Sequence, residues 1–234
     1  MNSPARRHYQ RVTAARAAGD AEPGQPQHGE QFELMAAALW EARRTLKAIR
    51  SREAKIAKKR ELLPQFDDYV AGVLEGGNGA QDVVVMTVMV WRIDTGDLDG
   101  ALAIAEYAMR HGLDTPDHYE RDTASLITEE VAESALRSMD REEEASQHAE
   151  RAARLSLILA RTEALTREAD MHDEIRAKLY KAWGQAARAR GNHDAEALEH
   201  LRRALELNDR AGVKKDIEKL ERELKQQNNG SPGA

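Results

Sequence analysis

Residues 82–113, DVVVMTVMVWRIDTGDLDGALAIAEYAMRHGL, decide which class of fold this chain adopts. By composition, the apolar run Val83–Val90 suits a strand. It stands, however, before the short turn at residues 95–97 and an alanine-rich segment. A buried helix, a tight turn and a second helix fit that order better than a strand does. The stretch therefore predicts a helical hairpin.

A second stretch, residues 178–208, repeats the pattern with slightly longer spacing. Each copy has a tryptophan, a glycine at the turn and small residues beyond it: Trp91, Gly96, Ala101 and Ala108 in one, Trp183, Gly191, Ala197 and Ala204 in the other. Glycine at the turn and small residues at a helix crossing resemble tetratricopeptide-type hairpins. Two distant copies do not make a regular array, so we predict an irregular, tetratricopeptide-like helical-hairpin domain over residues 80–225.

The composition of the whole chain favours helix. Alanine, leucine, glutamate, lysine and arginine dominate the 234 residues, and only 4% of the residues are aromatic. An all-α fold of one large or two small domains, with an aliphatic core, follows from this. The chain contains no cysteine, which excludes disulfides, cysteine-ligated zinc and thiol nucleophiles.

The sequence shows no sign of a membrane segment. Its longest apolar run, VVVMTVMVW, is much shorter than the roughly 20 residues that a membrane-spanning helix needs. The first residues, MNSPARRHYQR, lack the apolar core of a signal peptide. We therefore expect a soluble, cytoplasmic protein with no membrane partner.

Positive charge is concentrated near the start of an acidic chain. The formal net charge is -6, yet residues 1–60 contain 13 lysines and arginines against six acidic residues. Within residues 43–60, RRTLKAIRSREAKIAKKR, nine cations stand against the single acid Glu53. Such asymmetry suggests an anion-binding region in a protein that is otherwise acidic.

The basic run is predicted to lie on one long helix from Gln31 to about Leu63, which Pro64 ends or kinks. Leu46, Ile49 and Ile56 fall on one side of this helix. The candidate DNA-binding residues, all cationic, are Arg43, Arg44, Lys47, Arg50, Arg52, Lys55, Lys58, Lys59 and Arg60. Like charges three or four residues apart repel by a few tenths of a kcal/mol per pair, and an external anion would relieve that repulsion.

Duplex DNA is the natural candidate for this anion, because a row of cations on a helix can match a row of phosphates. The simpler alternative is a solvated, charged helix face. We predict residues 31–75 as a long basic helix region that binds DNA and contributes to oligomerisation.

The first thirty residues are predicted as a basic helix followed by a linker. Ser3 can cap a helix and Pro4 suits its first turn, whereas residues 19–30, GDAEPGQPQHGE, are rich in glycine and proline. Further candidate DNA contacts on this helix, a second and mobile basic element, are Arg6, Arg7 and Arg11.

The carboxy-terminal region carries an apolar stripe. Val213, Ile217, Leu220 and Leu224 recur at spacings of four, three and four residues, which predicts a short coiled coil or helix-packing seam. The stripe packs within its own domain or an oligomer, or alternatively against a separate partner. Residues 226–234, QQNNGSPGA, are predicted to be a disordered tail.

Local spacing reveals no clear catalytic constellation. The eight histidines form no HExxH or similar metal pair, and no Ser/His/Asp set can be identified. Asp94, Asp97 and Asp99, with Asp82 or Glu106, could hold a hard cation such as Mg²⁺. A helix start also favours acids, which is the simpler explanation. We therefore predict no cofactor and no metal, apart from Mg²⁺ if the protein is a nuclease.

Several segments resemble one family, the small terminase subunit of temperate, contractile-tailed phages with cohesive-end genomes, often called the terminase endonuclease subunit. The matching segments are SPARRHYQRV, RTLKAIRSREAKIAKKRELLP, GNGAQDVVVMTVMVWRIDTGDLDGALAIAEYAMRHGL, TEEVA, DEIRAKLYK and AGVKKDIEKLERELK. The resemblance extends from about Ser3 to Lys225.

The resemblance implies a role in packaging phage DNA into proheads in the host cytoplasm. Small terminase subunits recognise the packaging site, usually assemble as rings and deliver DNA to the large ATPase subunit. Residues 43–60 are the region to which DNA contact would be carried over. Two alternatives stay open: a metal-dependent endonuclease that itself cuts the cohesive-end site, and a helical-repeat adaptor that binds only proteins.

Overall fold

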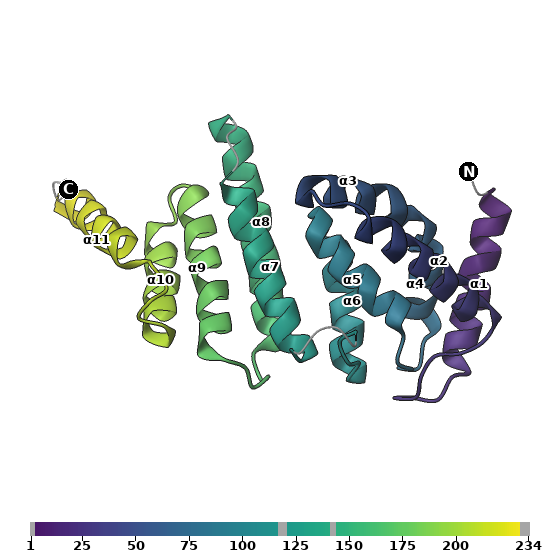
Figure 1. Cartoon of the computed structure of the whole chain (residues 1–234). Coiled ribbons are helices and arrows are strands. Elements are labelled where there is room, and N and C mark those ends of the chain that lie inside the picture. The colour runs from purple at the N-terminus through teal and green to yellow at the C-terminus, as the bar shows by residue number, and fades with distance from the viewer. Residues whose placement is uncertain (1–2, 117–120, 141–143, 230–234) are drawn as a thin grey trace. The chain divides into compact units, whose positions relative to one another are not determined.

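Helices make up nearly all of the regular structure (Figure 1). The computed structural model describes residues 3–116, 121–140 and 144–229. Within these ranges the chain forms eleven α-helices, one 3-10 turn at Leu63–Gln65 and no β-strand, which confirms the all-α prediction. The helices are α1 (Pro4–Gly19), α2 (Glu30–Lys47), α3 (Arg52–Leu62), α4 (Asp67–Gly76), α5 (Val83–Thr95), α6 (Leu98–His111), α7 (Thr123–Met139), α8 (Ala145–Thr166), α9 (Asp173–Ala189), α10 (Asp194–Leu207) and α11 (Lys214–Asn229).

The helices divide between two compact units, residues 1–123 and 124–234. In the first unit, α1 packs against α4, and α5 contacts α2, α3, α4 and α6. In the second unit, α9 packs between α8 and α10, and α10 also contacts α11. None of the helices in the described ranges combines the length and the apolar character that spanning a bilayer requires.

The hairpin of α5 and α6 confirms that residues 83–95 form a helix rather than a strand. All eight side chains from Val84 to Trp91 in α5 are buried, which explains why this part of the sequence shows no alternation of polar and apolar residues. Gly96 ends α5 with a positive φ of 85°, a left-handed conformation that costs glycine little. The Oδ1 atom of Asp97 then accepts a hydrogen bond from the Gly100 backbone N–H and starts α6.

The first helix is docked rather than mobile, which corrects the sequence prediction. Small residues let α1 and α4 approach until their backbones touch. A Cβ atom added at Gly72 would lie 2.3 Å from the Arg11 carbonyl oxygen, and one at Gly76 would lie 2.7 Å from that of Ala15. The capping role predicted for Ser3 is confirmed, because its Oγ accepts a hydrogen bond from the Arg6 N–H at 3.3 Å.

The linker after α1 lies along the chain before α5. The backbone N–H of Gln27 donates to the Gln81 carbonyl at 2.9 Å, and that of Gln81 donates to the Gln25 carbonyl at 2.8 Å. A further bond joins Gly24 N–H to the Gly79 carbonyl at 2.8 Å. These bonds satisfy loop groups that have no helical partners.

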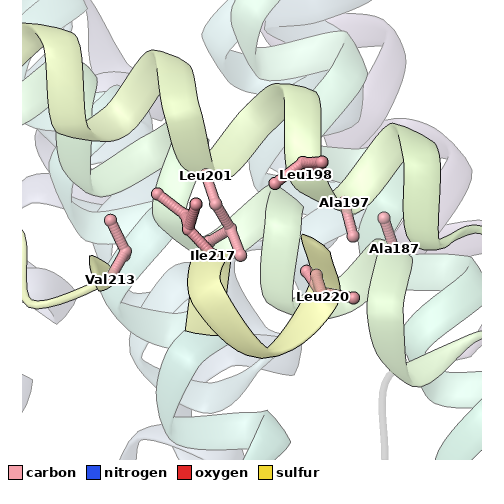
Figure 2. Close-up of a cluster of buried hydrophobic side chains, with 7 residues drawn as sticks. All are labelled: Ala187, Ala197, Leu198, Leu201, Val213, Ile217 and Leu220. Carbon is pink, nitrogen blue, oxygen red and sulfur yellow. The ribbon is translucent and has the colours of Figure 1, made fainter. Parts of the chain in front are cut away.

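The apolar stripe near the carboxy terminus packs inside its own unit, which confirms one of the two predicted alternatives. Figure 2 shows Val213, Ile217 and Leu220 directed at side chains of α9 and α10. The full cluster consists of Ala187, Ala197, Leu198, Leu201, Val213, Ile217 and Leu220. Helix α11 continues to Asn229, so the first four residues of the predicted disordered tail are helical. Residues 230–234 lie outside the described ranges.

Small residues at the crossing of α9 and α10 also agree with the sequence pattern. A Cβ atom at Gly184 would lie 2.6 Å from the Leu201 side chain, and Ala197 and Ala204 are fully buried. The turn contains Gly191 and Asn192, both with positive φ. The finer likeness to tetratricopeptide hairpins stays a prediction.

The stability of the second unit is expected to depend on pH through the titration of His200. Its ring stacks on Trp183 with centroids 4.0 Å apart, and burial lowers its pKa even though Glu196, Glu199 and Glu163 act to raise it. The folded state therefore binds this proton less readily than the unfolded chain, whose histidine pKa is about 6.5. Stability should fall as pH drops below that value, by at most about 1.4 kcal/mol per pH unit.

Thermal melts between neutral and mildly acidic pH would measure this effect. The His200→Gln variant is expected to show a shallower decline of stability with falling pH than the unaltered protein. Identical slopes for the two proteins would contradict the assignment.

Candidate nucleic-acid interface

A groove between α2, α3 and α5 gathers four cationic side chains. It has a volume of about 450 Å³ and is open to solvent. We call it the basic groove. Its lining residues are Arg43, Leu46, Lys47, Lys55, Lys59, Thr87 and Trp91. All four cations belong to the run that the sequence analysis singled out, and the structure brings them together.

The cations converge because the basic run folds as two helices, not as the single helix predicted from Gln31 to Leu63. Helix α2 ends at Lys47, and α3 begins at Arg52. Between them, the Oγ of Ser51 accepts a hydrogen bond from the backbone N–H of Ala54 at 3.3 Å. A serine cap offers the backbone an alternative to continuous helix, which favours the break.

Each helix contributes two cations from one face. Arg43 and Lys47 are four residues apart on α2, and Lys55 and Lys59 are four residues apart on α3. Residues at this spacing are neighbours on a helix surface. The turn between the helices therefore sets two pairs of positive charges around one groove.

Two of the four cations are held by the groove wall. Lys59 forms an ion pair with Asp94, and its Nζ lies 5.8 Å from the centroid of the Trp91 ring. The Nη2 of Arg43 donates to the Oγ1 of Thr87 at 2.8 Å. The contacts to Asp94, Thr87 and Trp91 all attach the basic helices to α5.

The other two cations, Lys47 and Lys55, have no ion pair and no side-chain hydrogen bond with any residue in the described part of the chain. Lys47 is exposed and Lys55 is half-buried. Their charges are therefore not balanced locally by carboxylates, and the groove is suited to bind phosphate or another anion.

The remaining cations of the run lie outside the groove: Arg44, Arg50, Arg52, Lys58 and Arg60. Arg44 pairs with Glu41 at 3.0 Å and Lys58 with Glu61 at 2.7 Å. Arg60 donates to the Thr95 carbonyl at 3.0 Å. Arg50 and Arg52 are exposed and make no such contact within the described ranges. The carboxylates that pair with this run all belong to the first unit.

The amino-terminal arginines do not line the groove. Arg7 pairs with Asp68 at 3.0 Å and Arg11 with Glu75 at 2.8 Å, and both partners lie on α4. The hydrogen bond to Asp68 raises the pKa of the Arg7 guanidinium. Arg6 is exposed on α1. Arg7 and Arg11 therefore link α1 to α4.

The acidic residues proposed as Mg²⁺ ligands have other structural contacts. Asp94 pairs with Lys59, and Asp97 caps α6 and lies 3.4 Å from Arg92. Asp82 is buried and caps α5. Among the described residues, no group of three histidine or acidic side chains is placed to hold a metal ion.

Two groove residues, Thr87 and Trp91, were missed as site residues in the sequence analysis. They are four residues apart on α5, so a helical assignment places them on one face. Thr87 is the one polar residue in the run Val83–Trp91, and that is the signal that could have drawn attention to this face.

Comparison with known proteins places the chain among phage packaging proteins. The family model described as phage small terminase subunit matches residues 36–174, which include all of α3 and α5. The "Terminase, endonuclease subunit" of Escherichia phage P2 is 48% identical over 234 residues, which cover 100% of this chain and 90% of the relative. The "Probable terminase, endonuclease subunit" of Haemophilus phage HP1 (strain HP1c1) is 24% identical over 205 residues, covering 82% of this chain and 70% of the relative.

No solved structure matches the chain. The family assignment therefore depends on sequence: a family model that spans more than half of the chain and a relative that is similar over the whole length of this chain. The chain belongs to the phage small terminase subunit family.

Proposed function

We propose that this small terminase subunit binds phage duplex DNA in the basic groove and delivers it to the large ATPase subunit in the host cytoplasm. Membership of the phage small terminase subunit family indicates a role in DNA packaging. The groove supplies a physical means of contact with DNA. The observation that carries the proposal is the pair Lys47 and Lys55, two cations that local carboxylates leave unbalanced in an acidic chain.

The chemistry of the groove favours affinity over sequence recognition. Lysine and arginine contacts to phosphates position a protein on DNA, whereas contacts to base edges supply specificity. We propose that self-association into a ring multiplies the phosphate contacts of one groove. This arrangement would let weak individual contacts add up along a duplex.

Salt dependence of duplex binding tests the proposal. Each neutralised phosphate contributes about -0.9 to the slope of log affinity against log salt, so two to four groove contacts per chain predict a slope of roughly -2 to -4 per bound subunit. Binding of a labelled duplex containing the cohesive-end site would be measured over a salt series by fluorescence anisotropy. A slope near zero, or no binding at low salt, would overturn the proposal.

Mass in solution tests the ring. Light scattering at moderate salt, with and without the cohesive-end duplex, is expected to show a single species of several subunits. A monomer under both conditions would contradict self-association. A complex with the large subunit and no affinity for DNA would instead favour the protein-only adaptor.

The names of the two relatives raise a second candidate function, intrinsic DNA cleavage. In this chain Asp94 pairs with Lys59, Asp97 caps a helix and Asp82 is buried at the start of α5, which it caps. We propose that this chain positions DNA and that the complete terminase complex cuts it. Plasmid incubated with the purified chain and Mg²⁺ or Mn²⁺ should stay intact, and nicking without the large subunit would overturn this division of labour.

A further inference from the structure

Trp40 exposes a large aromatic ring beside the basic groove. Its side chain on α2 is 60% exposed, whereas that of Trp91 is 5% exposed. An exposed tryptophan is unusual because burial of an aromatic ring is strongly favourable. This ring is part of neither the unit's core nor the lining of the groove.

Helical geometry places Trp40 on the same face of α2 as the groove cation Lys47. At about 100° per residue, seven residues return to within about 20° of the starting direction, two turns further along the helix. The guanidinium of Arg44 lies 5.4 Å from the centroid of the Trp40 ring. On the amino-terminal side of the ring, Ala36 and Ala37 are too small to cover it.

The neighbours of Trp40 favour a nucleic-acid partner over an apolar protein surface. Leu34, the other exposed large apolar residue of α2, lies about 120° around the helix from Trp40, so the two do not form one apolar stripe. Burying Trp40 against an apolar surface would also desolvate Arg44. A nucleobase attached to a phosphate strand would instead stack on the ring while its phosphates meet the cations.

We propose that Trp40 stacks on an unpaired base, so that the surface formed by Trp40, Arg44 and the basic groove binds single-stranded DNA or a frayed duplex end. The inference depends on the proposed function, because the same groove holds the backbone. It adds a preference for unpaired strands, which phosphate contacts alone do not give.

Binding of labelled oligothymidylate to the full chain would test the inference, with a blunt duplex of matched length as comparison. Loss of one base stack typically costs about tenfold to a hundredfold in affinity, so Trp40→Ala should weaken oligothymidylate binding by that factor. It should change blunt-duplex binding by no more than about threefold. Leu34→Ala is the matched control, since Leu34 is 54% exposed on the same helix but on another face.

Tryptophan fluorescence supplies a second readout. Oligothymidylate should quench part of the emission of the unaltered protein, and that part should be absent in Trp40→Phe. This variant should keep its affinity within about threefold, since a phenyl ring still stacks. Equal oligothymidylate affinities for Trp40→Ala and Leu34→Ala would overturn the inference, as would equal losses for oligothymidylate and duplex in a folded Trp40→Ala protein.

The experiment separates failure of this inference from failure of the proposed function. If blunt duplex binds with the expected salt dependence but Trp40 has no effect on the single strand, the groove is retained and the stacking site is wrong. If neither nucleic acid binds to the unaltered protein, both proposals are wrong.

Discussion

Replacement of Lys47 and Lys55 together by glutamate is expected to weaken duplex binding by about a hundredfold or more. Each lysine would lose a charge-assisted phosphate contact worth about 1.5–3 kcal/mol, and about 1.4 kcal/mol corresponds to a factor of ten. The new carboxylates would also repel the phosphates. The salt slope should become less negative by roughly two, since two contacts no longer release counterions.

The double variant is expected to fold normally, which makes the result interpretable. Lys47 and Lys55 make no ion pair or side-chain hydrogen bond within the described residues, so their reversal breaks no polar contact there. Reversing Lys59 would be less informative because it would set a carboxylate against Asp94. Likewise, reversal of Lys58 would remove its ion pair with Glu61.

A matched control separates the groove from net charge. Lys214 and Lys215 are exposed at the start of α11 in the second unit. Their replacement by glutamate changes the net charge by the same amount and should leave duplex affinity within about threefold, because long-range effects are screened by salt. Binding that survives in the groove variant, or that falls equally in both variants, would show that the basic groove is not the DNA site.

Local sequence signals were sufficient to predict much of the helical framework. Gly96 marked the turn between α5 and α6, and Ser3 marked the start of α1, because both depend on residues only a few positions away. The 4-3-4 stripe of α11 predicted a buried face, and Ile217 and Leu220 do lie in one. Each of these features depends on interactions or spacings between residues that are close together in the sequence.

Long-range contacts could not be read in the same way. The sequence predicted one basic helix, and only the structure shows that Ser51 breaks it and that both halves attach to α5 through Lys59 and Arg43. Docking of α1 depends on Gly72 and Gly76 fitting against its backbone, which no local pattern reveals. The candidate cations were therefore predictable as a set, whereas their division into paired and unpaired members was not.

Replacement of Asp82 by alanine is expected to destabilise the first unit by about 2–4 kcal/mol. Asp82 is 1% exposed, and its Oδ1 accepts hydrogen bonds from the backbone N–H groups of Val84 and Val85 at 2.8 and 3.1 Å. Its Oδ2 accepts from the hydroxyl of Tyr69 at 2.6 Å. Loss of a helix cap costs about 0.5–2 kcal/mol, and a buried hydroxyl left without a partner costs about 1–3 kcal/mol more.

The comparison with Asp82→Asn isolates the charge from the hydrogen bonds. Asparagine keeps an oxygen for the α5 cap and an amide that can donate to Tyr69, so it should cost less than alanine by about 1 kcal/mol or more. Urea denaturation of the unaltered protein, Asp82→Ala and Asp82→Asn, followed by far-ultraviolet circular dichroism, would measure the differences in their free energies of unfolding. Equal stabilities for the alanine and asparagine variants would contradict the assigned cap.

Asp82 is also expected to make the stability of the first unit depend on pH. Burial raises the pKa of Asp82 above its ordinary value, although hydrogen bonds from Tyr69, Val85 and Val84 oppose the change. As pH rises from about 4, the unfolded chain therefore loses this proton before the folded protein does. Stability contributed by Asp82 must then fall with rising pH until the folded pKa is passed, by at most about 1.4 kcal/mol per unit. The decline should be absent in Asp82→Asn. A decline of the same size in the unaltered protein and in Asp82→Asn would assign it to other groups.

The stability of the first unit also bears on DNA binding, because α5 supplies Thr87 and Trp91 to the basic groove. A variant destabilised at Asp82 should therefore lose the basic groove and its DNA affinity when the first unit unfolds.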